Sequence, residues 1–369
     1  MMELDYVLFL QREMNKALQE LVEAAEGLEE AKQRGDKVAR KKYEQQIKEA
    51  ARQACEVDPA VAPTVAFLWL RACYPGLEDH IREIWSPFLS EESLCDLLLE
   101  HASLHTSKYW KIALDFTLRK PYLSKDDTEF YILDNPVRKE WVFKVPYIAP
   151  SQWKGALRAA MVQELKRWWE RFLNDEKAAH LEEFAERRFR MTLLFGDEKG
   201  EEPGSLKGLA KYLDDLGGEE AANLYRQKVK KFFNTKAESP LPHHQGWLHF
   251  CPTYFDRIGL EVINPHSRET GAGERPIHFE SVPADTKGRF VLLYVPLAEV
   301  SEKEMLEDFR AVVLGIRAMF EKYGFGAKTS SGFGRAYVRW RKEEGAEVQP
   351  EKKLWNEWKR IWREEEPHE

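Results

Sequence analysis

The residue types best suited to binding lie close together between Gly324 and Arg335. Glycine accepts positive φ angles and lets a ligand approach the backbone closely, and consecutive amides in such a turn can form a concave site for anions. Phe325 and Phe333 are candidates for stacking on nucleobases. We call residues 324–335 the glycine loop; its glycine and polar positions are Gly324, Gly326, Lys328, Thr329, Ser330, Ser331, Gly332, Gly334 and Arg335.

The elements around the glycine loop exclude a P-loop. That motif needs a glycine directly before the lysine, a strand before the loop and a helix after it, but here Ala327 precedes Lys328. Apolar residues from Met305 to Phe320 recur with helical spacing, and residues 336–340 alternate as in a strand. The sequence therefore predicts a helix, the glycine loop and then a strand. A flexible connection in any α+β domain is the alternative interpretation.

A second candidate is a pair of cations at the start of a predicted helix. Pro150 and Ser151 fit a helix start, and the helical pattern continues to Trp169. Lys154 and Arg158 are four residues apart, so they share a face near the end of the helix that attracts anions. The pair suits a phosphate backbone, although such pairs are more often only a solvated helix face.

The composition fits a folded chain with a busy surface, with 43% hydrophobic and 32% charged residues. A net charge of −7 excludes a uniformly basic nucleic-acid-binding protein but permits a basic groove. No apolar run approaches the ~18–20 residues of a membrane span, and no signal peptide is evident. Cys55, Cys73, Cys95 and Cys251 are scattered, so we expect reduced thiols, no zinc site, and a cytoplasmic protein without a membrane partner.

The chain divides into three predicted parts. Residues 1–107 have the apolar periodicity of helices and read as an all-α N-terminal region. Residues 108–345 mix alternating strand patterns with helical ones, and residues 346–369 form a C-terminal amphipathic helix that we expect to pack on the body. The polar segment 264–283 is long for a hairpin loop, and such loops tend to be functional or disordered.

Together these segments resemble the RAMP superfamily of CRISPR-associated proteins, and most of all the backbone, target-RNA-cleaving subunits of type III effector complexes. The motifs follow in chain order: the strand at Ile112, segments 134–138 and 147–158, Leu194-Phe195-Gly196, Gly246-Trp247-Leu248, segment 264–271 and the glycine loop. The family usually has Pro-Gly-Ser-Ser where this chain has Ala149-Pro150-Ser151-Gln152. The resemblance implies an α+β fold with a ferredoxin-like, RRM-like core and helical insertions, preceded by the all-α region.

The resemblance also implies the partners and the binding residues. The partners would be a guide CRISPR RNA, a target single-stranded RNA and other CRISPR-associated subunits. Because contacts to the RNA backbone are independent of sequence, base pairing would choose the target. The RNA-binding residues would be Lys154, Arg158, Arg268, Gly326, Lys328, Thr329, Ser330, Ser331, Gly332 and Arg335.

Catalysis is implied at Asp134, which by its motif corresponds to the family's metal-dependent aspartate. The ribose 2′-OH would attack the phosphodiester in line, and Asp134 would hold Mg²⁺ or Mn²⁺ whose remaining ligands are RNA phosphates. Asp126 and Asp127 compete for this role, and a turn-capping Asp134 is the structural alternative. Two other functions stay open. One is a RAMP subunit that only binds RNA and scaffolds or caps a complex, and the other is a metal-independent repeat-RNA endoribonuclease using His243 and His244.

Overall fold

The computed structural model describes most of residues 16–31 and then residues 34–57, 108–124, 135–140, 144–198, 208–263 and 277–363. In the N-terminal part, helix α2 (Lys37–Val57) follows a turn at Gly35, where φ is 71°. Helical structure on both sides of this turn agrees with the predicted all-α region. Residues 58–107, which carried the rest of that prediction, lie outside the described residues.

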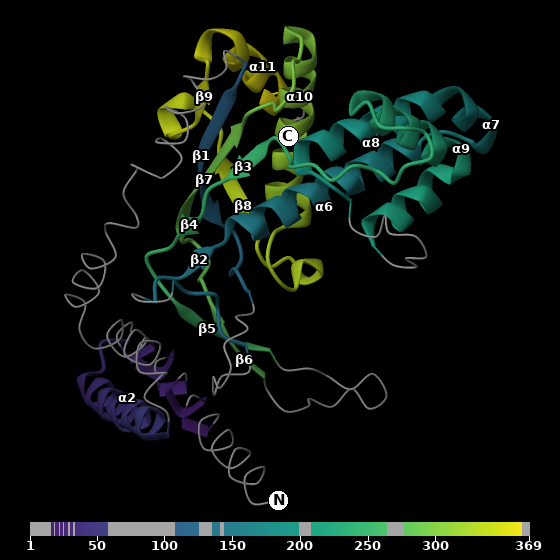
Figure 1. Cartoon of the computed structure of the whole chain (residues 1–369). Coiled ribbons are helices and arrows are strands. Elements are labelled where there is room, and N and C mark those ends of the chain that lie inside the picture. Colours follow the sequence, from purple (N-terminus) through teal and green to yellow (C-terminus); the bar gives the residue numbers. More distant parts are fainter. Residues whose placement is uncertain are drawn as a thin grey trace, which may run out of the picture.

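An antiparallel sheet forms the centre of the fold (Figure 1). Its order is β3-β7-β1-β8, and β9 also pairs with β1. With α6 after the first core strand and α10 after the third, this is the ferredoxin-like order, in which all neighbours are antiparallel. The strands are β1 (Trp110–Leu118), β3 (Leu248–Phe250), β7 (Lys287–Tyr294), β8 (Ala336–Arg339) and β9 (Glu347–Gln349).

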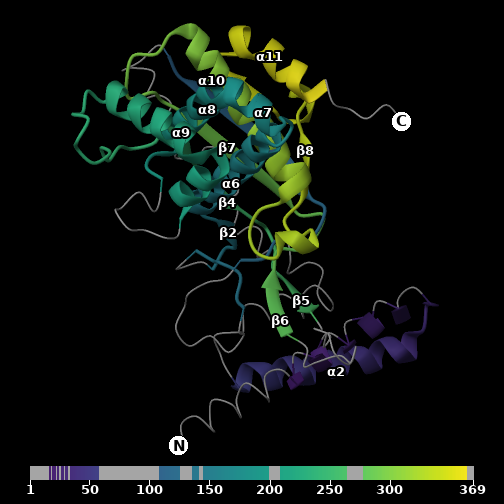
Figure 2. The same ribbon diagram turned by 90° about the vertical axis from the view of Figure 1, so that its right-hand side faces the viewer.

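Helices α6 (Pro150–Trp169) and α10 (Glu302–Ala318) cover one face of this sheet (Figure 2). Alternate side chains of β1 point toward them: Trp110 contacts Phe309 of α10, and Phe116 contacts Trp153 of α6. The helix predicted from Met305 onward is confirmed and begins with a capping box, in which Ser301 and Glu304 bond each other's backbone N–H groups. The apolar face of β1 therefore packs against the apolar faces of α6 and α10, and together they form one core.

Two insertions extend the ferredoxin-like core. The first is helical, and its kink at Gly218, with φ of 83°, lies at the glycine pair that the sequence marks as a turn. Arg188 is buried there and bonds Glu198 and Asp214, which ties α8 to α9. The second is the hairpin β5–β6. The elements are α7 (Asn174–Lys177), η2 (Ala178–His180), α8 (Leu181–Phe195), α9 (Leu209–Phe232), β2 (Tyr147–Ile148), β4 (Thr253–Tyr254), β5 (Gly259–Ile263) and β6 (Ile277–Ser281).

The C-terminal helix α11 (Glu351–Arg363) packs on the body, as its apolar stripe predicts. Trp358 is fully buried and donates from Nε1 to Trp340 O at 2.8 Å. The division of the chain into three parts stays a prediction. The remaining short elements are the π-helical turn η3 (Met319–Tyr323) and the 3-10 turns η4 (Thr329–Ser331) and η5 (Lys342–Glu344).

The expectation of reduced thiols is wrong for Cys251, which is disulfide-bonded. Its side chain is buried with Ala113 and Val291 on the sheet face opposite α6 and α10. Spacing along the chain does not reveal which cysteines meet in space, so this bond could not be predicted from the sequence. None of the helices in the described parts is both long and apolar enough to cross a membrane.

Candidate nucleic-acid interface

The backbone of the glycine loop has a conformation that side chains would prevent. Its glycines at 324, 326, 332 and 334 all have φ between 68° and 88°, and Lys328 has φ of 55°. A Cβ on Gly326 would lie 2.4 Å from Leu123 O, and one on Gly334 would lie 1.8 Å from Phe325 O. The glycines are therefore required by both dihedral angle and space.

Hydrogen bonds hold the glycine loop against the segment that follows β1. Ala327 N donates to Leu123 O at 2.8 Å, and Gly334 N donates to Pro121 O at 3.0 Å. On its other side the same segment pairs with the end of β6, since Tyr122 and Val282 exchange backbone hydrogen bonds. The loop is thus a fixed structure, contrary to the interpretation as a flexible connection.

A groove of about 670 Å³ lies between the glycine loop and one flank of α6. Small residues on α6 make room for it, at positions 155, 156, 159 and 160. Polar groups surround the space: Gln152 and Gln163 from the helix, and Thr329, Ser330 and Arg335 from the loop. Of the predicted RNA-binding residues, Gly326, Thr329, Ser330 and Arg335 line this groove, whereas Lys328, Ser331 and Gly332 do not.

Two described cations line this groove, and Lys322 is paired with Glu164 at 2.6 Å, which leaves Arg335 as the cation without a partner there. Its side chain is half-buried, and its Nε is enclosed without a hydrogen-bond partner. Within the described parts of the chain, no carboxylate forms an ion pair with it. A buried guanidinium N–H without an acceptor is costly, and the planar guanidinium fits a phosphate with two parallel hydrogen bonds. The arrangement therefore suits an anionic ligand.

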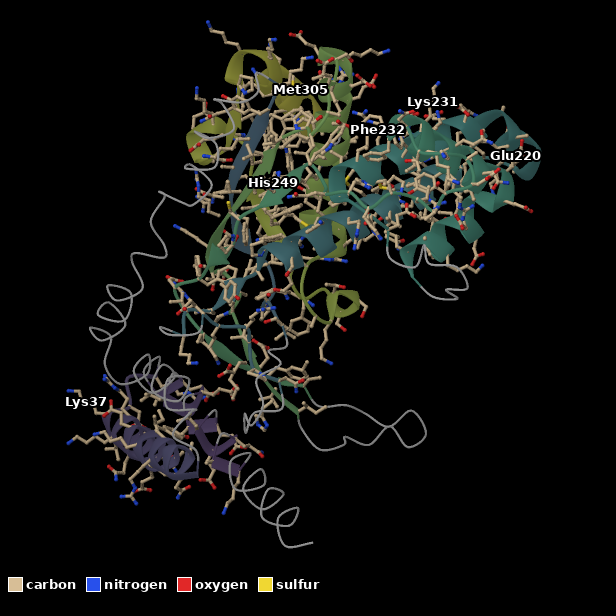
Figure 3. All side chains as sticks on the ribbon, viewed as in Figure 1. Lys37, Glu220, Lys231, Phe232, His249 and Met305 are labelled. Carbon is tan, nitrogen blue, oxygen red and sulfur yellow. The ribbon has the colours of Figure 1, made fainter. Side chains whose placement is uncertain are left out.

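Lys154 and Arg158 lie on the other flank of α6, away from the groove. The pKa of Lys154 is lowered mainly by burial and then by the charge of Arg158. The pKa of Arg158 is also lowered by burial, although the charge of Glu198 acts in the opposite direction. Neither cation forms an ion pair among the residues that the structure describes. His249 lies on β3 (Figure 3). Its pKa is lowered by burial and, to a smaller extent, by the charge of Lys154. A phosphate beside Lys154 and Arg158 would offset their unfavourable desolvation.

Lys328 points away from the groove toward the hairpin β5–β6. Its Nζ lies 4.9 Å from the ring centroid of Phe279 on β6. Phe279 forms a bridge with Asn135, and Asn135 O accepts a hydrogen bond from Glu280 N at 3.0 Å. The lysine of the loop is thus near the residue that follows Asp134 in the chain.

Asp134 itself lies outside the described residues, as do Asp126, Asp127 and Arg268. The described parts of the chain contain no group of three His, Cys, Asp or Glu side chains that would hold a metal ion. Glu280, the buried carboxylate of β6, bonds Val137 N at 3.2 Å and the ammonium group of Lys139. The described side chains therefore do not form a metal site on their own.

The RAMP superfamily model matches residues 104–337, more than half of the chain. The chain belongs to the RAMP superfamily. Among solved structures it is similar to a chain of the type III-B Cmr-beta bound to cognate target RNA, with 16% identity over 81% of this chain and 76% of that chain and a TM-score of 0.38. It is also similar to Cmr6 from Pyrococcus furiosus, with 18% identity over 63% and 99% and a TM-score of 0.30. No curated protein matches the chain.

In this RAMP protein the histidines considered for metal-independent catalysis are bonded to the end of α8. Asp197 contacts His243 Nδ1 at 2.6 Å and accepts from His244 N at 2.8 Å. His244 Nε2 lies 2.9 Å from Thr192 O, a carbonyl that can only accept, so this nitrogen donates. His244 therefore holds the segment before β3 against α8, and its Nε2 is not available as a base.

The sequence interpretation missed two features of the RAMP core near the groove. Phe325 is only 2% exposed and packs on Trp153 and Phe116, so it does not stack on a base. Glu164 on α6 accepts a hydrogen bond from Tyr323 Oη at 2.6 Å, and this bond holds the turn η3 against α6. The pKa of Tyr323 is raised first by burial and second by this hydrogen bond. The small residues at positions 155, 156, 159 and 160 share one flank of α6. This pattern could have predicted that another segment approaches the helix closely on that flank.

Proposed function

We propose that this RAMP protein is a guide-RNA-binding subunit of a type III CRISPR effector complex. The observation that carries the proposal is the half-buried Arg335, whose enclosed Nε lacks an acceptor beside a fixed glycine loop. A backbone held open by glycines at positive φ, with hydroxyls at Thr329 and Ser330, is suited to RNA phosphates. Membership of the RAMP superfamily supports RNA as the ligand.

The two flanks of α6 suggest the course of the RNA. Arg335 and the loop hydroxyls line the groove on one flank, and Lys154 and Arg158 lie on the other. A strand crossing the N-terminal turn of α6 would contact both sets and pass the end of the helix that favours anions. All these groups are suited to phosphates, so the guide would be held without regard to its sequence.

The test is co-expression with a CRISPR array, followed by purification and sequencing of the bound RNA. We expect short RNAs with repeat-derived ends and spacer interiors. Arg335→Ala is expected to reduce the recovered RNA about a hundredfold, because it removes both the charge and the paired hydrogen bonds to phosphate. Lys303→Ala is the matched control, because Lys303 has an 86% exposed side chain and lies on α10 outside the groove. RNA of random sequence, or none, would overturn the proposal.

Cleavage of a target RNA through Asp134 is the finer part of the proposal. Lys328 lies over the ring of Phe279, and Phe279 pairs with Asn135. A phosphate held by this lysine would therefore lie close to Asn135, the residue after Asp134. Cleavage needs in-line attack by the 2′-OH, which a carboxylate can orient. Mg²⁺ or Mn²⁺ would supply electrostatic stabilisation of the phosphate, with RNA oxygens completing its ligands.

Asp134→Ala and Asp134→Asn test this part. Both are expected to abolish target cleavage while guide RNA and partner subunits still co-purify, and EDTA is expected to have the same effect on the native protein. Asp126→Asn and Asp127→Asn are the matched controls, because they remove the competing carboxylates. Unchanged cleavage in both Asp134 variants would leave a subunit that only binds RNA and scaffolds the complex. Cleavage that persists in EDTA would favour the metal-independent ribonuclease.

A further inference from the structure

The outer face of the sheet, opposite α6 and α10, has a pattern of its own beside the edge strand β8. The strand register places Lys287, Thr117 and Tyr337 in one row across β7, β1 and β8. The adjacent row on the same face consists of Arg289, Asp115 and Arg339. Core residues of β1 alternate with Asp115 and Thr117, so these two rows project away from the helices.

Three cations in and beside these rows are not neutralised. Asp115 bonds Arg289 at 2.9 Å, and Arg289 also bonds Glu347. Lys287, Arg339 and Arg119 are exposed and form no ion pair with any described residue. The cluster is thus positive on a chain whose net charge is −7.

An aromatic ring lies among these cations. Tyr337 is 61% exposed, and the guanidinium of Arg119 lies 4.8 Å from its ring centroid. Of the large hydrophobic side chains that are exposed in the described chain, Tyr337 is the one on β1, β7 or β8. Protein interfaces usually have an apolar centre within a polar rim, but the described residues in the two rows around Tyr337 are charged or polar. Single-stranded nucleic acids, in contrast, use isolated aromatic rings flanked by cations.

This outer face is continuous with the glycine loop. Arg119 N donates to Arg335 O at 2.8 Å, and Lys120 Nζ donates to Ser331 O at 3.1 Å. Tyr337 follows Arg335 by two residues, about 7 Å along a strand. β8 pairs with β1 at one edge and has no other neighbour among the described strands. A nucleic acid leaving the groove at Arg335 therefore reaches Tyr337 by rounding one edge strand.

We propose that the RNA strand held in the glycine-loop groove continues around β8 onto the outer face of the sheet. Tyr337 stacks on an unpaired base there, and Arg119, Lys287 and Arg339 hold the flanking phosphates. This inference rests on the proposed function, because it extends the path of the same RNA. It assigns the outer face to single-stranded RNA and not to a neighbouring protein.

The test uses the full chain and a fluorescent single-stranded RNA, titrated at several salt concentrations. Tyr337→Ala is expected to weaken binding by about tenfold through loss of one stacked base, whereas Tyr337→Phe keeps the ring and binds like the native protein. Replacing Arg119, Lys287 and Arg339 by Gln is expected to lower the slope of log affinity against log salt by about 2, near 0.7 for each phosphate. The matched control replaces Lys41, Lys42 and Lys48 on α2, which are exposed, and should change neither quantity.

The outcomes separate this inference from the proposed function. If Arg335→Ala weakens binding while all outer-face variants bind like the native protein, the extended path is wrong and the groove remains. If the native protein binds no RNA, both proposals fail. If the outer-face variants keep their RNA affinity but lose a co-purifying subunit, the face belongs to a protein contact and the inference is overturned. Crosslinking of a 4-thiouridine-containing RNA to the peptide with Tyr337 is the expected independent result.

Discussion

The two flanks of helix α6 are built on opposite plans. On the groove flank, small residues of α6 leave open space, and the glycine loop contributes a fixed backbone and the guanidinium of Arg335. On the cationic flank, Lys154 and Arg158 are half-buried and their pKa values are lowered by that burial. The first flank is preorganised by shape, while the second holds charges that the fold leaves unneutralised. We therefore expect variants on the groove flank to act through the shape of the site, and variants on the cationic flank to act through its charge.

Gly334→Ala is expected to have the largest effect, because it breaks the shape of the groove flank. A Cβ would meet Phe325 O at 1.8 Å, and φ of 68° is unfavourable for alanine. We expect a loss of about 3 kcal/mol in the free energy of unfolding, as is typical of a forced backbone shift. Urea denaturation of the full chain measures it. A loss below about 0.5 kcal/mol, the size of an ordinary surface change, would contradict the fixed-loop description.

Arg335→Lys and Arg158→Lys compare the kind of charge that each flank needs. Lysine keeps the charge of Arg335 but loses the planar pair of donors, so RNA affinity is expected to fall about tenfold. Arg158 lies on the flank where we expect charge alone to matter, and its lysine variant should bind within about twofold of the native protein. Equal losses in the two variants would remove the distinction between the flanks. RNA titration at constant salt is the measurement.

Substitutions of Gly155 test whether empty space is what the groove flank supplies. A Cβ at Gly155 meets nothing within 4 Å, and the position is helical, so Gly155→Ala is expected to stabilise the protein by about 0.5–1 kcal/mol. Gly155→Leu projects into the groove and is expected to reduce RNA affinity without reducing stability. A thermal melt and an RNA titration of both variants decide the matter. Unchanged RNA affinity in Gly155→Leu would mean that the ligand does not fill this space.

Lys154→Met is expected to have the smallest effect, with opposite signs in the two assays. Burial lowers the pKa of Lys154, so the unfolded chain binds its proton more tightly than the folded protein. Stability then rises with pH between the folded and the unfolded pKa, and the charged amine is slightly unfavourable at neutral pH. The variant should therefore be slightly more stable in urea, should lose this advantage as the pH approaches the usual lysine pKa, and should bind RNA more weakly. A less stable variant with native RNA affinity would contradict this account.

The regular elements could be predicted from the sequence because their cause is local. Alternation at Ile112, Leu114 and Phe116 gives β1, and the apolar repeat from Met305 gives α10. The arrangement around α6 could not be predicted in the same way. Helical spacing places Lys154 and Arg158 on one face, but only the packing of the glycine loop against residues 121–124 shows that this face is not the groove. Burial of Phe325 and the bonding of His244 to Thr192 depend on the same long-range packing.

The π-helical turn η3 has a consequence for how this chain tolerates change in length. In the turn Met319–Tyr323 the backbone takes one residue more than an α-helical turn before the glycine loop begins, and Gly324 N closes it on Met319 O at 2.8 Å. Deleting one residue there restores the α-helical repeat, but rotates everything downstream by about 100° around the helix axis. Arg335 and β8 would then leave on the wrong side of α10. Relatives that keep the groove are therefore expected to keep this one-residue insertion, whatever their residues at these positions.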